Sequence, residues 1–231
     1  MKPTSRLFPS SLRIIVFLAL VFGVVFSSIG IPVSGAARPL EVAPAKTALP
    51  TLATFTTQVT NGKASQITGL FADGIFADAV VQQPSGNAAY ISTQPNTVTQ
   101  FSSASSFGSL GFLAHNTLAG SLFPKLAQNS IFTIIYGDGH QENYIVTQIR
   151  HFQALKPTDP YSSFKDLEKG KTLSASDLFY QTYGVSKQVI LQTCIASNGV
   201  DSWGRLFVIA KRYVAAQASI PANVPEYAVA Q

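Results

Sequence analysis

Residues 131–149 read IFTIIYGDGHQENYIVTQI, and this stretch decides the fold class. Two runs rich in β-branched and aromatic residues, 131–136 and 144–149, flank the turn residues Gly137-Asp138-Gly139. Strand-forming runs separated by a short segment that contains glycine are typical of a β-hairpin. The centre of the chain is therefore expected to be β-structure.

Outward from this hairpin, strands remain the dominant signal and helices are expected to be short. Further strands are expected at 75–82, 88–91, 188–194 and 206–210, and single helical turns at 107–113 and 118–126. Residues 157–179 carry Pro, Gly and Ser throughout and are expected to form a long connection, a feature that is often functional. Many short strands with one long loop predict an all-β barrel or sandwich.

The N-terminus has the pattern of an export segment. Lys2, Arg6 and Arg13 precede a mostly apolar run over 14–33, and small residues follow at 34–37. This pattern is typical of a signal peptide, and a run of about 20 residues is also long enough to span a bilayer. Both interpretations place the body of the protein outside the cytoplasm. The chain is expected to divide into a signal peptide or membrane anchor (1–37), a Pro/Ala-rich linker (38–54), a main domain (55–215) and a flexible tail (216–231).

The charge distribution argues against a nucleic-acid partner. The 231 residues carry a formal net charge of +5, but three of the positive charges stand in the export segment, before the first acidic residue. The main domain is therefore nearly neutral, and no cluster of Lys and Arg with interleaved aromatic residues recurs in it.

The chain contains a single cysteine, Cys194, at the end of an apolar run. An exported protein with one cysteine cannot form an internal disulfide, and a lone thiol in an oxidising compartment is either buried or used. A nucleophilic thiol needs a basic or cationic neighbour, because an ordinary thiol is only about 3% ionised at neutral pH.

Three histidines and one arginine are candidates for that neighbour. His140 falls in the hairpin turn and His151 follows a strand, so both are interpreted as surface residues. His115 lies where a strand gives way to a short helix that Asn116 or Thr117 could cap. Arg205 opens the next apolar run after Cys194, and it would lie beside the thiol if the two runs pair.

Three motifs in this order resemble the sortase family. They are Ala114-His115-Asn116-Thr117 followed by the Gly120–Leu126 stretch, Leu191-Gln192-Thr193-Cys194, and Arg205 before an apolar strand. The resemblance covers roughly 69–212 and includes the hairpin strand with Tyr144-Ile145-Val146. It implies a closed β-barrel of about eight strands with short helices over 55–215.

The resemblance also implies the chemistry. Cys194 would be the nucleophile, His115 its acid/base partner and Arg205 the stabilising cation, with Thr193, Ala114 and Asn116 contacting the substrate. The substrate would be an exported protein with a C-terminal sorting motif, and the acceptor an amine on the cell wall or on another protein. The N-terminal segment would hold the enzyme at the membrane.

No cofactor or metal is expected. Some relatives bind calcium, and acidic side chains do occur in the long connection, but their spacing fits no EF-hand loop; they are Asp159, Asp166, Glu168 and Asp177.

Three alternatives remain open beside the transpeptidase. A hydrolysis-only peptidase would use the same fold and intermediate, with water in place of the amine. An L,D-transpeptidase would carry its cysteine in a Ser-x-Gly-Cys segment, which Gln192-Thr193-Cys194 does not match. A non-enzymatic extracellular β-domain would bury Cys194 as an inert thiol.

Overall fold

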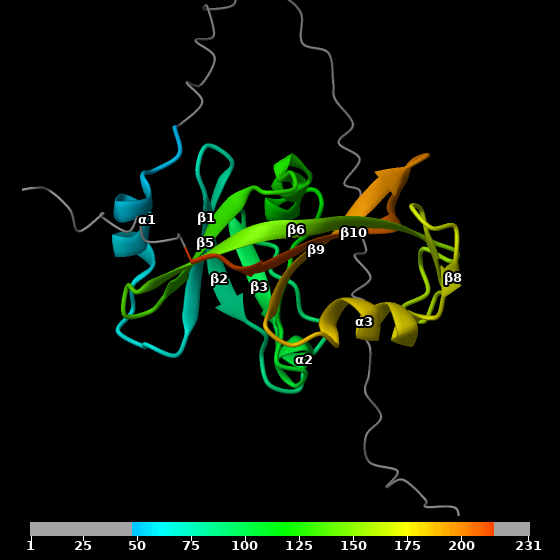
Figure 1. The fold of residues 1–231 in the computed structure, drawn as a ribbon, viewed down its shortest axis with the longest axis horizontal. Helices are drawn as coiled ribbons and strands as arrows, with labels where there is room; N and C mark the ends of the chain where they lie inside the picture. The colour runs from blue at the N-terminus through cyan, green and yellow to red at the C-terminus, as the bar shows by residue number, and fades with distance from the viewer. Residues whose placement is uncertain (1–47, 215–231) are drawn as a thin grey trace, which may run out of the picture.

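The computed structural model describes residues 48–214 (Figure 1). The predicted signal or anchor segment and the predicted tail lie outside these residues, as does most of the predicted linker. Among the residues described, no helix is both long enough and apolar enough to cross a membrane. The first helix begins at Leu52, slightly before the expected start of the domain at 55.

The described chain is mostly β-structure. Its elements, in order, are α1 (Leu52–Val59), β1 (Ile67–Ala72), β2 (Phe76–Gln82), β3 (Thr97–Phe101), α2 (Ser102–Ser105), β4 (Leu110–Leu113), the 3-10 helix η1 (Ala119–Lys125), β5 (Ile131–Tyr136), β6 (Gln141–Ala154), β7 (Phe164–Asp166), β8 (Thr172–Leu173), α3 (Ala175–Tyr183), β9 (Gln188–Ser197) and β10 (Val200–Arg212).

Eight of the ten strands close into a barrel. The sheet order is β10-β9-β4-β3-β2-β1-β5-β6-β7-β8, and β10 also pairs with β6, which joins the first and eighth strands of that order. Closure satisfies the hydrogen-bonding edges that an open sheet would expose. Strands β7 and β8 continue outside the ring. The predicted closed barrel of about eight strands with short helices is confirmed.

The predicted hairpin at 131–149 forms as β5 and β6, with Ile131 opposite Ile145 and Ile135 opposite Gln141. Alternate residues of the strands fill the barrel interior, which is built mainly of branched aliphatic and phenylalanine side chains. A second apolar layer lies outside the barrel, where β6, β9 and β10 are covered by β7 and α3. A third, smaller cluster seats Phe55 of α1 against Phe71 and Ile135. In Figure 1, α1 lies at one end of the molecule and α3 with β8 at the other.

Two expectations about secondary structure are wrong. Residues 88–91 form no strand, because the Gln83 side chain donates to the carbonyls of Ala88 and Tyr90 and satisfies them in a loop. Part of 107–113 is strand β4 and no helical turn, because it pairs with β3 on one side and β9 on the other. The pairing with β9 joins residues far apart in sequence, which local patterns do not report.

The connection at 157–179 is also more ordered than expected. It contains β7, β8 and the first half of α3. The helix begins after Ser174, whose hydroxyl accepts a hydrogen bond from the Asp177 amide at 3.1 Å. Its buried residues have the spacing of one helical face: Ala175, Leu178, Phe179, Thr182 and Tyr183.

Candidate active site

Cys194 lies within β9 and not at its end. The strand continues for three more residues to Ser197 and turns at Asn198 and Gly199, whose φ angles are 52° and 75°. Two central residues with positive φ are typical of the type I′ turn that links two antiparallel strands. The segment expected to be a loop between Cys194 and Arg205 is therefore a hairpin between β9 and β10.

Arg205 is the direct cross-strand partner of Cys194. The register of β9 and β10 places the two residues opposite each other, with Leu206 opposite Thr193 and Phe207 opposite Gln192. Directly opposed residues of antiparallel strands point to the same face, with Cβ atoms about 5 Å apart. The thiol and the guanidinium therefore share the outer face of the barrel, beside the apolar layer under α3.

The guanidinium of Arg205 is held rigidly. The side chain is 2% exposed, and Nη1 donates to the carbonyl oxygens of Ser202 at 2.9 Å and Gly204 at 2.8 Å. The cation also faces the ring of Phe164 in β7 at 5.8 Å from the ring centre. Its Nε is buried and has no hydrogen-bond partner among the described residues.

His115 follows β4, the strand on the other side of β9 from β10. Strand β4 runs parallel to β9 with Leu113 beside Gln192, and the Ala114 amide donates to the Gln192 carbonyl at 3.2 Å. His115 follows directly after this hydrogen bond, two residues beyond the end of β4 at Leu113. The structure therefore places Arg205 opposite Cys194 on one side of β9 and the segment that carries His115 on the other side of β9.

Hydrogen bonds around His115 fix its segment. The Thr193 hydroxyl donates to the Ala114 carbonyl at 2.9 Å. The Asn116 side-chain amide donates to the Asp201 carbonyl at 3.0 Å, which ties the histidine segment to β10 across β9. Thr193 and Ala114 are 3% and 4% exposed. We assign these three residues to positioning, and the substrate contact expected of them stays a prediction.

Gly120 of η1 is a further positioning residue, because only a glycine fits against the site from inside the barrel. A Cβ at this position would lie 2.7 Å from the Ala114 carbonyl oxygen and 2.8 Å from that of His115, and it would also overlap the Thr193 hydroxyl. Two of these three contacts are backbone, which cannot swing aside. The glycine in the motif is therefore explained by close approach.

Gly120→Ala is expected to destabilise the fold by about 1–3 kcal/mol, the usual result of overpacking, and to lower the reactivity of Cys194. The first effect is measured by urea unfolding and the second by the rate of thiol alkylation. Ser121→Ala, at the exposed neighbouring position, is the matched control and should leave both unchanged. Equal behaviour of the two variants would show that Gly120 has no positioning role.

In the resting site the Cys194 thiol and the His115 imidazole are both uncharged. Burial raises the pKa of the Cys194 thiol, while the Arg205 guanidinium opposes this shift and Asp201 adds to it. Burial lowers the pKa of His115, against the opposing effect of the Ile91 carbonyl. The Nδ1 atom of His115 is buried without a hydrogen-bond partner in the described part of the chain. At neutral pH most molecules therefore carry a thiol and a neutral imidazole.

Alkylation of Cys194 by iodoacetamide is expected to accelerate with pH and to reach its midpoint above that of a free cysteine. Asp201→Asn should move the midpoint down, because it removes a negative charge that disfavours the thiolate. Arg205→Met should move it up, because it removes the cation that favours the thiolate. A midpoint that both variants leave in place would contradict this electrostatic account.

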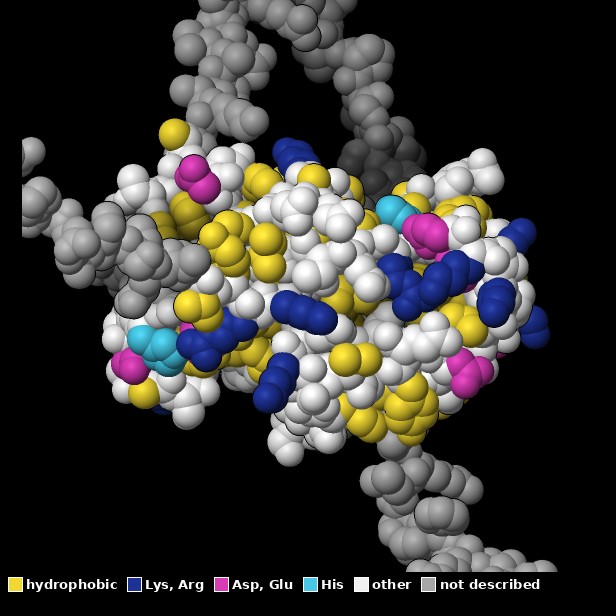
Figure 2. All heavy atoms as spheres, in the orientation of Figure 1, with side chains coloured by type: hydrophobic (Ala, Val, Ile, Leu, Met, Phe, Trp, Pro, Cys, Tyr) yellow, Lys and Arg dark blue, Asp and Glu magenta, His cyan; other side chains and the backbone are white. Residues whose placement is uncertain are grey.

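The remaining candidates lie elsewhere on the surface. His140 bonds to Asp138 at 2.8 Å in the β5–β6 turn, and His151 bonds to Glu168 at 2.8 Å. The acidic residues of the long connection are occupied in local contacts; Asp166, for example, pairs with Arg150 at 2.9 Å. Within residues 48–214 no group of three His, Cys, Asp or Glu side chains is arranged to hold a metal ion. Figure 2 shows Lys and Arg side chains in several separate groups among hydrophobic and acidic ones.

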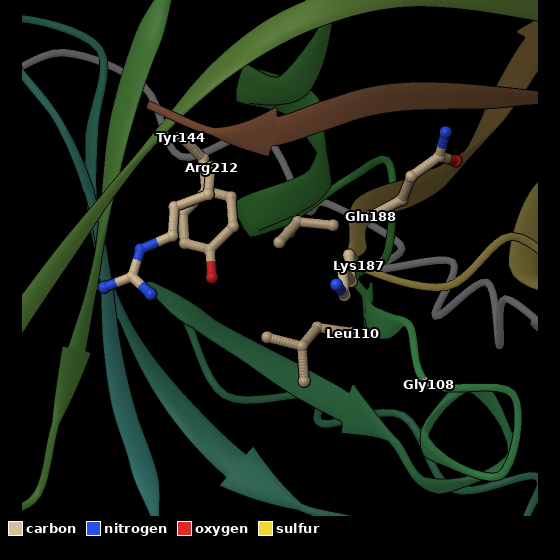
Figure 3. A pocket seen from close by; sticks show the side chains of 7 residues that line it. Gly108, Leu110, Tyr144, Lys187, Gln188 and Arg212 are labelled. Carbon is tan, nitrogen blue, oxygen red and sulfur yellow. The ribbon is translucent and has the colours of Figure 1, made fainter. Parts of the chain in front are cut away.

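A cavity of about 440 Å³ opens at the far end of the barrel from Cys194 (Figure 3). It lies beside the start of β9 and the end of β10, whereas Cys194 and Arg205 lie toward the other ends of these strands. In Figure 3, Arg212 and Tyr144 lie on one side, Lys187 and Gln188 on the other, and Leu110 between them. This cavity shares no residue with the site around Cys194.

Solved structures similar to this chain include sortases. Streptococcus agalactiae sortase C1 is 18% identical over 73% of this chain and 79% of its own, with a TM-score of 0.41. Sortase C from Clostridium perfringens SM101 is 14% identical over 71% and 85%, with a TM-score of 0.39. Sortase A from Corynebacterium diphtheriae is 12% identical over 68% and 64%, with a TM-score of 0.39. No protein-family model and no curated protein matches the chain.

Sequence reasoning missed several residues that build the site. Phe164, within the predicted connection at 157–179, faces the Arg205 cation. The Asp201 carbonyl accepts a hydrogen bond from the Asn116 side chain, and the charge of Asp201 helps to raise the pKa of Cys194. Ser202 and Gly204 hold the guanidinium through backbone carbonyls, which no side-chain pattern reports. One signal for this arrangement is present in the sequence. The dipeptide Asn198-Gly199 is typical of a tight hairpin turn, and it predicts that the strands on either side of it, β9 and β10, pair with each other.

Proposed function

We propose that this chain is an extracytoplasmic cysteine transpeptidase of the sortase type. The observation that carries this proposal is the position of Cys194, directly opposite Arg205 on β10. We assign His115, in the segment that follows β4, as the imidazole that acts with it. A thiol between an imidazole and a fixed guanidinium has the three parts that acyl transfer needs: a nucleophile, a proton carrier and a donor for a developing oxyanion.

The first half-reaction forms a thioester. Cys194 Sγ attacks a backbone carbonyl carbon, and the thiol proton passes to His115 as the S–C bond forms. Arg205 donates to the carbonyl oxygen as it becomes negative, while its Nη1 atom stays bonded to two backbone carbonyls that hold the guanidinium in place. The intermediate collapses, the C–N bond breaks, and His115 returns the proton to the departing amine.

The second half-reaction transfers the acyl group. An acceptor amine attacks the thioester carbonyl, gives its proton to His115, and displaces the Cys194 thiolate, which is then reprotonated. We propose that the acyl donor is an exported protein with a C-terminal sorting motif. The acceptor would be an amine on the cell wall or on another surface protein, and the N-terminal segment would keep the enzyme at the membrane. Resolution of the thioester by water would make the chain a peptidase instead.

The test is hydroxamate release. The enzyme is incubated with hydroxylamine and a library of peptides that vary at the candidate sorting motif, and products are read by mass spectrometry. The proposal expects a subset of peptides to yield a hydroxamate at one bond, and a natural amine to replace hydroxylamine in that product. Cleavage to a free acid alone would assign a peptidase. Absence of any cleavage, together with a native thiol that is not alkylated at all under conditions that alkylate the unfolded chain, would favour the non-enzymatic β-domain.

A further inference from the structure

The cavity of about 440 Å³ at the end of the barrel far from Cys194 takes no part in the proposed acyl transfer (Figure 3). Its floor is apolar, because Tyr144 and Val189 belong to the barrel interior and Leu110 packs against the same core. The mouths of β-barrels are frequent ligand sites, and ligand cavities usually measure about 300–1,000 Å³. The cavity therefore has the place and the size of a small-molecule site.

Two exposed cations also line this cavity, and they come from neighbouring strands. Gln188 of β9 pairs with Lys211 of β10, and Lys187 and Arg212 are the next residues of the chain beyond this pair. In Figure 3 Leu110 lies between Lys187 and Arg212. The Arg212 side chain is 63% exposed, and Lys187 is exposed as well, so both charges are open to a ligand from solution.

One of the two cations has a partner and the other does not. Arg212 Nη2 lies 2.8 Å from a Glu142 carboxylate oxygen, and Glu142 also accepts hydrogen bonds from the hydroxyls of Tyr136 and Tyr144. Within residues 48–214 Lys187 forms no ion pair. Two cations beside one carboxylate leave the cavity with a single uncompensated positive charge.

The backbone at Lys187 is also unusual. Its φ angle is 61°, and its amide donates to the Gly108 carbonyl at 2.8 Å, which holds it in this conformation. Glycine and asparagine adopt a positive φ more easily than lysine does, and residues held in such conformations cluster at functional sites. An asparagine would suit the backbone better, so a lysine here points to a role for its ammonium group.

We propose that this cavity binds a small organic carboxylate. Its anionic group contacts Lys187 and Arg212, and its hydrocarbon part lies against Leu110, Tyr144 and Val189. One uncompensated positive charge suits a monoanion better than a phosphate dianion, and the apolar floor favours a ligand with hydrocarbon over an inorganic ion. A cationic ligand would meet two like charges. The assignment rests on one end of the barrel and does not depend on the proposed acyl transfer.

The test is a titration of the ¹⁵N-labelled full chain with sodium hexanoate, followed by NMR. Saturable shifts are expected at the amides of Gly108, Lys187 and Gln188, with a dissociation constant on the order of millimolar for so small a ligand. 1-Hexanol and hexylammonium chloride share the alkyl chain but lack the carboxylate, and they should give no saturable shift. Added sodium chloride should weaken hexanoate binding, because exposed charges are screened by salt.

Three variants test the contacts. Lys187→Asn should weaken hexanoate binding several-fold, the scale of one exposed ion pair, without lowering the thermal unfolding midpoint, because asparagine tolerates a positive φ. Lys211→Gln is the matched control and should bind as the wild type does: it removes an equal charge next to Arg212, and Lys211 is not among the described residues that line the cavity. Leu110→Trp should block the floor while it keeps both cations.

The outcomes decide between a built site and general attraction of anions. Absence of saturable shifts, or equal binding of 1-hexanol, would overturn the proposal. So would sodium phosphate that binds as tightly as hexanoate, or an equal loss of affinity in Lys187→Asn and Lys211→Gln. Should Leu110→Trp fail to fold, the comparison of these two lysine variants still decides. Each folded variant should keep the wild-type rate of Cys194 alkylation, which separates this site from the proposed active site.

Discussion

Cys194→Ala is expected to abolish hydroxamate release, a loss of at least about 10⁴-fold, as is usual when a covalent nucleophile is removed. No other thiol exists in the chain to substitute for it. The reaction needs a bond between Sγ and the acyl carbon, and neither His115 nor Arg205 can form a thioester. The measurement is the initial rate of hydroxamate formation from a peptide that the wild-type enzyme cleaves.

Cys194→Ser is the matched control for that experiment. The hydroxyl keeps the size and the hydrogen-bonding capacity of the site, but it ionises far less readily than a thiol, so activity should remain close to that of the alanine variant. Circular dichroism of both variants should match the wild type, since Cys194 is half-buried and contributes little to packing. Residual turnover in the alanine variant near the wild-type rate would remove Cys194 from the mechanism altogether.

His115→Ala is expected to lower kcat/KM by about 10²–10⁴-fold, the usual contribution of a general acid/base. Because the neutral pair predominates at rest, His115 must take the thiol proton during attack and return it to the leaving amine. The matched controls are His140→Ala and His151→Ala, which remove exposed histidines bonded to Asp138 and Glu168. Both control variants should retain wild-type activity.

The pH profile gives this prediction its specific signature. Activity requires a neutral His115 and a protonated Cys194, or their ion-pair equivalent, so it falls below the first pKa and above the second. Burial lowers the pKa of His115 and raises that of Cys194, and the bell should therefore be wider than for unperturbed residues. His115→Ala should lose the acidic limb. A profile with that limb intact would mean that another group carries the proton.

Local patterns in the sequence were sufficient for much of the fold. The hairpin at 131–149 and the strands at 75–82, 188–194 and 206–210 all form, although β6 runs on to Ala154 and β10 begins six residues earlier, at Val200. Alternation of apolar residues specifies such strands without reference to the rest of the chain. Residues 107–113 were misassigned because β4 exists only through its pairing with β3 and β9. The helix within 157–179 was hidden by the surrounding Pro, Gly and Ser.

For the candidate active site too, the sequence predicts one part and only the tertiary structure shows the other. The sequence by itself determined which residues are candidates: one thiol, three histidines and an arginine that begins an apolar run, ordered as in a known family. Residue type limits the chemistry, so this much follows from composition and order. The tertiary structure alone decided that Arg205 lies opposite Cys194, that β4 leads the His115 segment along the other side of β9, and that Gly120 packs against the Ala114 and His115 carbonyls. Register between strands distant in sequence sets these positions, and barrel closure fixes that register for every strand at once.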